Sequence, residues 1–166
     1  IGNGLTIPAG PLREDLSNLR YYKNVFLNGN LENLEIIKEQ ILKINSEINI
    51  HIGKYQAMNI DEFDTQKKYL VFSGIGNHQS FISMIKSYGL NVQKDIEFPD
   101  HYLYSNNDIN HIFKKANDMK CEIITTEKDY LRLDKNNLNK IKFIKSRLKI
   151  IDEQKLINML LTINET

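Results

Sequence analysis

The stretch from Tyr69 to His78, YLVFSGIGNH, decides the fold, because it joins an apolar strand to a glycine turn and the start of a helix. Helical periodicity continues through Phe81, Ile82 and Ile85, and Gly89 lies where a helix C-cap belongs. A strand that turns directly into an amphipathic helix begins a βαβ unit, so this stretch predicts a parallel sheet.

The same alternation of β-rich and amphipathic segments extends through the whole chain. We expect strands at residues 24–28, 48–55, 69–73, 90–98, 122–126 and 148–151, and helices at residues 31–44, 78–88, 106–119 and 152–161. Strands separated by helices of this length imply a mainly parallel sheet. The sequence therefore predicts one layered α/β domain over residues 1–166.

Composition limits the class of protein. The 166 residues carry 22 Lys and Arg against 21 Asp and Glu, a formal charge of +1, which argues against a general nucleic-acid binder. No apolar run approaches the roughly 18 residues that a transmembrane helix needs. Cys121 is the one cysteine, which excludes an intrachain disulfide and makes the reducing cytosol the default compartment. A loop-like start at Ile1 without methionine predicts that the chain begins mid-protein.

Four segments place polar or glycine residues at the ends of predicted strands, which is the edge of an open α/β sheet where ligands bind. The first, residues 2–14, is rich in glycine and proline and predicts a series of turns. Arg13 can pair with a phosphate in a bidentate manner, and Glu14 can hold a metal or a ligand hydroxyl. The alternative is a structural turn with a solvated ion pair.

The second segment is the glycine turn at Gly74, Gly76 and Asn77. Glycines before a helix allow backbone N–H groups to approach an anion. As a dinucleotide fingerprint the turn is weak, because Gln79 stands at the third glycine position, although Asp95 or Glu97 follows about 20 residues on. The alternative is a tight turn that needs glycine for positive φ.

The third segment places Asp100 and His101 directly after a predicted strand and Pro99. A histidine titrates near neutral pH and can serve as a general base or steer a charge. The alternative is an ordinary surface histidine. The other three histidines (His51, His78 and His111) have no such setting and are assigned no role.

The fourth segment is Thr125 to Asp129, a strand end that runs into a helix. Either threonine can cap this helix, and the early acidic residues favour its positive end. Capping explains most of the segment. Lys128 is the exception and is a candidate contact for a substrate anion. The sequence contains no P-loop, nucleophile elbow or zinc-protease motif.

Taken together and in this order, residues 2–14, 72–77, 98–104 and 125–129 resemble the C-terminal half of the tetraacyldisaccharide 4'-kinase family, the lipid A 4'-kinases of Gram-negative bacteria. The resemblance extends from Gly2 to Leu133. The sequence departs from the family at Asp15, where the family usually has proline.

The resemblance implies a P-loop kinase of two Rossmann-like lobes, of which this chain is the C-terminal one: a three-layer α/β lobe with a mainly parallel sheet. Its partners would be a glycolipid substrate and the N-terminal lobe. That lobe would precede Ile1 and would make most of the contacts with ATP and Mg²⁺. The enzyme would phosphorylate the 4' hydroxyl of tetraacyldisaccharide 1-phosphate, giving lipid IVA. It would act peripherally at the cytoplasmic side of the inner membrane, and this chain alone would be inactive.

Residue roles carry over only where the motifs match. Glu14 matches an acidic position near Mg²⁺ and the nucleotide, and Arg13 beside it would face the phosphates. His101 matches the active-site histidine, with Asp100 as its neighbour. For five further positions only the match carries over, without a role: Gly74, Gly76, Asn77, Thr126 and Lys128. The rival hypothesis is a stand-alone Rossmann-like module that binds a nucleotide or a protein without catalysis.

Overall fold

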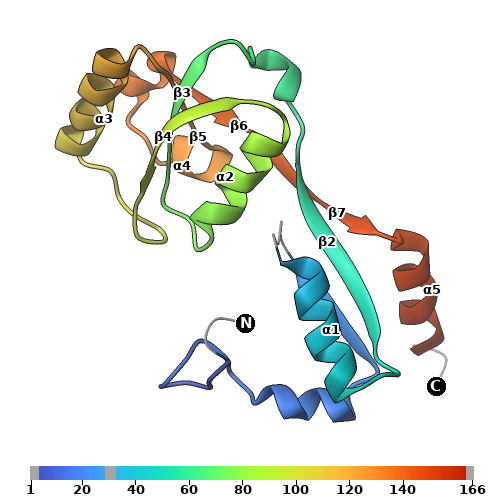
Figure 1. Ribbon diagram of the computed structural model, residues 1–166. Helices are drawn as coiled ribbons and strands as arrows, with labels where there is room; N and C mark the ends of the chain where they lie inside the picture. Colours follow the sequence, from blue (N-terminus) through green and yellow to red (C-terminus); the bar gives the residue numbers. More distant parts are fainter. Residues whose placement is uncertain (1–3, 29–32, 164–166) are drawn as a thin grey trace. The chain divides into compact units, whose positions relative to one another are not determined.

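The computed structural model describes residues 4–28 and 33–163, so Gly2, Asn3 and the start of the helix predicted at 31–44 lie outside the described residues. The chain divides into two compact units, of which the first comprises Ile1–Lys54 and Ile150–Thr166 and the second Tyr55–Lys149. Both contain helices and strands (Figure 1). One domain over residues 1–166 stays a prediction.

The first unit is built around a short parallel pair of strands, β1 (Asn24–Asn28) and β2 (Asn49–Ala57), the latter extending into the second unit. Helix α1 (Leu34–Ile44) buries Ile37 and Ile41 beside Ile48, because they recur at helical spacing on one face. The remaining elements of this unit are the 3₁₀ helix η1 (Leu16–Tyr21), the end of β7 (Ser146–Ile151), which neighbours β2, and α5 (Glu153–Ile163).

The second unit contains a four-stranded, fully parallel sheet in the order β4-β3-β5-β6. The strands are β3 (Lys68–Ser73), β4 (Asn91–Glu97), β5 (Glu122–Thr126) and β6 (Ile141–Ile144). The helices are η2 (Ile60–Glu62), α2 (His78–Ser87), α3 (Asn106–Met119), α4 (Glu127–Tyr130) and η3 (Lys135–Lys140).

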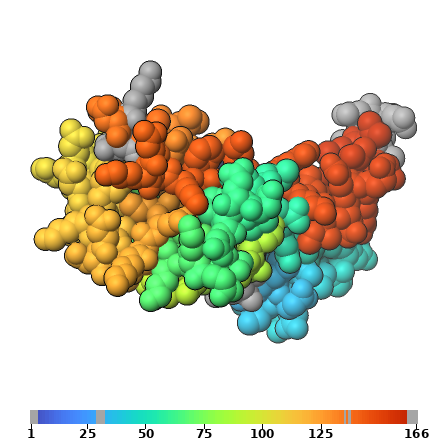
Figure 2. Space-filling view, turned by 90° about the horizontal axis from the view of Figure 1, so that it is seen from above, coloured from blue at the N-terminus to red at the C-terminus, as the bar shows by residue number. Residues whose placement is uncertain are grey.

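Strand β3 shows why this unit has three layers. Its side chains alternate between the two faces, and all are buried from Tyr69 onward. Tyr69 and Val71 belong to the core beneath α2, whereas Leu70 and Phe72 belong to the core beneath α3. Helix α3 presents its outer face at the surface (yellow to orange in Figure 2). The predicted three-layer α/β fold with a mainly parallel sheet is confirmed.

The sheet reverses its strand order next to β3. The chain goes from β3 through α2 to β4 on one side, then through α3 to β5 on the other side of β3. The carboxyl ends of β3 and β5 therefore flank the topological switch point, where open α/β sheets hold their ligands.

Three short elements of the second unit were not predicted: β6, η2 and η3. Strand β6 has only four residues, which is too short to stand out in the sequence. Helix η2 and the first residue of β3 lie in the polar stretch of residues 59–68. Among the described residues, no helix combines the length and the apolar character needed to cross a membrane.

Candidate functional site

Three of the four motif segments meet at the carboxyl edge of the second unit's sheet. The loop after β4 folds back onto the glycine turn after β3: Phe98 N–H donates to the Ser73 carbonyl (2.9 Å), and His101 N–H donates to the Gly74 carbonyl (3.0 Å). Helix α4 follows β5 at the same edge. The backbone thus brings Gly74, His101 and Thr126 into one site.

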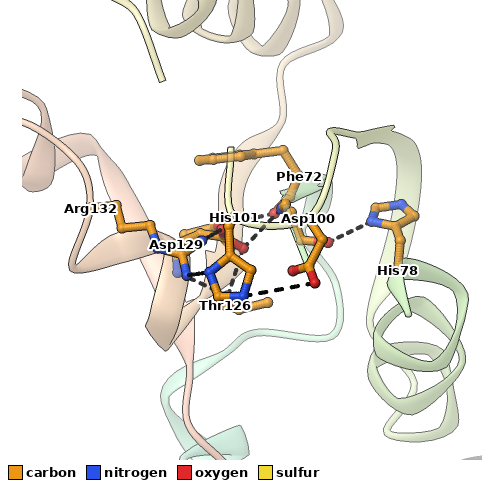
Figure 3. A network of polar contacts seen from close by, with 10 residues as sticks. Phe72, His78, Asp100, His101, Thr126, Asp129 and Arg132 are labelled. Atoms are coloured by element: carbon orange, nitrogen blue, oxygen red, sulfur yellow. Dashed lines mark hydrogen bonds and ion pairs between the residues drawn. The ribbon is translucent and has the colours of Figure 1, made fainter. Parts of the chain in front are cut away.

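Asp129 is the buried centre of this site (Figure 3). Its Oδ2 accepts hydrogen bonds from Gly74 N–H (3.1 Å) and from the Thr126 hydroxyl (2.7 Å), and its own N–H donates to Thr126 Oγ1 (3.1 Å). In many α/β proteins the N–H groups of a glycine turn at the switch point bind a ligand anion. Here the Gly74 N–H binds the Asp129 carboxylate of the same chain instead.

Arg132 links this buried carboxylate to the exposed His101 ring (Figure 3). Arg132 Nη1 lies 3.5 Å from Asp129 Oδ1, and Nη2 donates to His101 Nδ1 at 3.0 Å. The other ring nitrogen, Nε2, lies 3.8 Å from Asp100 Oδ2, too far for a hydrogen bond. The His101 side chain is 78% exposed, and its φ of 60° is in the left-handed region that non-glycine residues seldom adopt.

The glycine at position 74 is required by a close approach. A Cβ there would lie 3.0 Å from the Pro99 carbonyl oxygen, 3.1 Å from Tyr104 Oη and 3.2 Å from Tyr102 Cβ. Positive φ, the alternative drawn from the sequence, is wrong: among the described glycines only Gly4 and Gly89 have it. Position 74 therefore needs glycine because the loop after β4 lies against it.

Tyr104 closes the inner side of the site. Its ring packs edge-on against Phe72 at 5.3 Å and against Phe98 at 5.1 Å between centroids. Burial is the main cause, and nearby Asp129 a further cause, of a strongly raised pKa of the Tyr104 phenol. The hydroxyl has no hydrogen bond of regular geometry within the described residues. It therefore stays neutral and cannot act as a base.

His78, to which the sequence assigned no role, forms a second polar chain at the same edge. Its Nδ1 lies 2.6 Å from the Ser73 hydroxyl, and its Nε2 lies 3.1 Å from Asp95 Oδ2. The His78 side chain is fully buried, so it ties the end of β3 to β4 rather than facing a ligand. Asp95, one of the two acidic residues weighed for a dinucleotide fingerprint, is engaged by this histidine.

The remaining candidates of the second unit have mainly local contacts. Asn77 caps α2 by accepting from Ser80 N–H (2.9 Å), as Thr126 caps α4. Gly76 is exposed, and a Cβ there would meet Asp100 Oδ2 at 3.4 Å. Lys128 is exposed on α4 and has no ion-pair partner within the described part of the chain, which leaves its charge available.

Arg13 and Glu14 belong to the first unit. They follow a closed turn in which Ile7 N–H donates to the Leu12 carbonyl at 2.8 Å. Both side chains are exposed, and Glu14 Oε2 accepts a hydrogen bond from the Tyr22 hydroxyl (3.1 Å). Within residues 4–28 and 33–163, no group of three or more His, Cys, Asp or Glu side chains could hold a metal. Glu14 fits as one carboxylate ligand of a Mg²⁺ whose other ligands are phosphates and water.

Comparison with protein families gives a match over nearly the entire chain. The model of the tetraacyldisaccharide-1-P 4'-kinase family matches residues 1–165. A tetraacyldisaccharide 4'-kinase of Pelagibacter ubique (strain HTCC1062) is 56% identical over 165 residues, which are 99% of this chain and 52% of that protein. One of Rickettsia akari (strain Hartford) is 36% identical over 138 residues, 83% of this chain and 41% of that protein. The chain thus spans about half the length of the relatives it matches.

A solved structure shares the fold. The crystal structure of the "apo" form of LpxK from Aquifex aeolicus in complex with ATP matches 95% of this chain and 48% of its own, with a TM-score of 0.52 and 22% sequence identity. At this identity the likeness supports the α/β architecture alone.

Proposed function

Because the chain belongs to the tetraacyldisaccharide-1-P 4'-kinase family, we propose that it is the C-terminal lobe of a two-lobe enzyme. That enzyme transfers the γ-phosphate of ATP to the 4' hydroxyl of tetraacyldisaccharide 1-phosphate, giving lipid IVA. The relatives are about twice as long as this chain, which leaves room for an N-terminal lobe that binds ATP. In this proposal the enzyme is peripheral to the inner membrane, and it reaches its glycolipid acceptor from the cytoplasmic side.

One observation carries the proposal: His101 is exposed at the switch point of the sheet, while its backbone N–H and its Nδ1 are both engaged. Its backbone is held by Gly74 and its Nδ1 by Arg132, and that arginine pairs with the buried Asp129. An exposed ring on a rigid edge suits a group that must meet a substrate with defined geometry.

Phosphoryl transfer sets what the residues of this lobe must do. The 4' oxygen bonds to the γ-phosphorus as the bond to the ADP oxygen breaks, and the hydroxyl proton leaves to a base. His101 stands on the acceptor's side, where it either assists removal of that proton or stabilises charge on the transferred group. Asp100 adds negative charge beside the ring, 3.8 Å from Nε2.

Arg13 and Glu14 serve the nucleotide side in this proposal. Arg13 pairs with phosphate oxygens, and Glu14 supplies one oxygen ligand to Mg²⁺. When bound, Mg²⁺ neutralises charge that develops on the β- and γ-phosphates. Both side chains are exposed at the end of a closed turn, so they are free to contact another lobe.

The engagement of the Gly74 N–H by Asp129 supports this proposal over a stand-alone nucleotide-binding module. A Rossmann-like domain that binds a nucleotide by itself presents free N–H groups at its switch point. Here the Gly74 N–H is bound to Asp129, and no lysine follows the turn. The phosphates of ATP therefore need the other lobe.

Two measurements test the proposal. Calorimetric titration of the 166-residue chain with Mg-ATP should show no tight binding, and micromolar affinity would contradict the division of labour. A hybrid kinase can be made by fusing the unmatched part of the Pelagibacter ubique kinase to the N-terminus of this chain, before Ile1. This hybrid kinase should label tetraacyldisaccharide 1-phosphate from [γ-³²P]ATP. A well-folded hybrid that labels no acceptor would overturn the proposal.

A further inference from the structure

The contact between Arg132 and His101 has a direct chemical consequence. A guanidinium has N–H donors and no acceptor, so the ring nitrogen that it contacts carries no proton. Arg132 Nη2 lies 3.0 Å from His101 Nδ1. The neutral ring therefore carries its proton on Nε2, and Nε2–H is the group that it offers to other molecules.

Arg132 is itself held in place. Its side chain is only 25% exposed, and its Nη1 lies 3.5 Å from a carboxylate that is completely buried. That carboxylate is fixed through its other oxygen by Gly74 N–H and by the Thr126 hydroxyl. A chain of contacts thus runs from the fixed backbone of two strand ends, through Asp129 and Arg132, to an otherwise exposed imidazole.

We propose that Arg132, anchored by Asp129, is a positioning residue that holds the His101 ring with Nδ1 unprotonated and Nε2–H directed to the reacting groups. The consequence for catalysis rests on the proposed function: His101 acts as a hydrogen-bond donor to developing negative charge, and the proton of the acceptor hydroxyl goes to another base.

Nuclear magnetic resonance of the chain labelled with ¹⁵N-histidine tests the positioning without any assay of activity. The wild-type ring of His101 should show a single Nε2–H tautomer. Arg132→Met, which keeps the apolar stem and removes the donor, should give averaged signals from both ring nitrogens, and Arg132→Lys should restore the wild-type pattern in part. Arg147→Met, at an exposed arginine of the same unit, is the matched control and should change nothing.

Activity of the hybrid kinase gives the second arm. Arg132→Met should lower kcat by about 10- to 100-fold with little change in KM for ATP, because a misplaced group can cost on the order of 100-fold. Wild-type ring signals or a wild-type kcat in a folded Arg132→Met variant would overturn the inference. If the unmutated hybrid transfers no phosphate, the proposed function fails, and the ring signals alone decide whether Arg132 positions His101.

Discussion

Replacement of Asp129 by alanine should destabilise the second unit severely, because the carboxylate is completely buried and its partners would stay buried without it. The change removes the acceptor of two hydrogen bonds, from Gly74 N–H and from Thr126 Oγ1, and the counter-ion of Arg132. A hydrogen bond to a charged group contributes about 1.5–3 kcal/mol, and breaking a buried ion pair costs about 3–5 kcal/mol. These contributions overlap, since they belong to one carboxylate, so we expect a loss of about 3–5 kcal/mol.

Urea denaturation followed by circular dichroism measures this loss, and amide hydrogen exchange at Gly74 localises it. The Gly74 N–H should exchange slowly in the wild type and much faster in the Asp129→Ala variant. The control is Asp118→Ala, at an exposed aspartate on α3, which should stay within about 0.5 kcal/mol of the wild type. A loss below about 1 kcal/mol for Asp129→Ala, with Gly74 still protected, would refute the role of Asp129 as the anchor of this edge.

Three further outcomes are expected. In the hybrid kinase, Glu14→Ala should cut activity while leaving the melting temperature of the 166-residue chain nearly unchanged; lower stability with normal turnover would make the residue structural. Gly74→Ala should cost about 1–3 kcal/mol in urea denaturation because its Cβ would be crowded, whereas Gly76→Ala should cost little, and equal losses would contradict the close approach. Hydrogen bonds from two lysines, Lys142 first and Lys67 second, lower the pKa of Glu122 from its usual 4.5, so the chain should lose this stabilisation as pH falls below that value. Glu122→Gln should flatten that part of the stability–pH curve, and an unchanged curve would exclude the contribution.

The architecture of the second unit could be predicted because its signals are local. The apolar run of β3, the glycine turn and the periodicity of α2 are each readable within ten residues or so. Strand β6 could not be predicted, since four residues are too few to show a period, and its pairing with β5 is a contact that the sequence does not reveal.

The candidate site could be predicted only as far as its exposed members. His101 stood out because it follows a strand end and a proline, and the structure places it at the switch point. Asp129 and Arg132 did not stand out. An aspartate in the first turn of a helix is most simply explained by the helix dipole, and Arg132 belongs to no motif. Their roles depend on long-range contacts, the first with Gly74 across 55 positions and the second with His101 across 31.

His78 was missed for a similar physical reason. In the sequence it is an ordinary histidine at the start of a helix, and only burial between Ser73 and Asp95 gives it a partner on each ring nitrogen. The signal that was present, an acidic residue in the following strand, was considered only as part of a dinucleotide fingerprint. Burial of a histidine is decided by how α2 packs on the sheet, which its own neighbours do not reveal.

The central claim is that His101 serves the acceptor in phosphoryl transfer, and the steady-state kinetics of His101→Ala in the hybrid kinase test it most directly. A positioned group of this kind typically contributes roughly 100- to 10,000-fold, so kcat should fall in that range while KM for ATP changes little. His111→Ala, at an exposed histidine on α3, is the control and should retain wild-type kinetics. A His101→Ala enzyme whose kcat stays within about three-fold of wild type, less than about 1 kcal/mol of barrier, would contradict the claim.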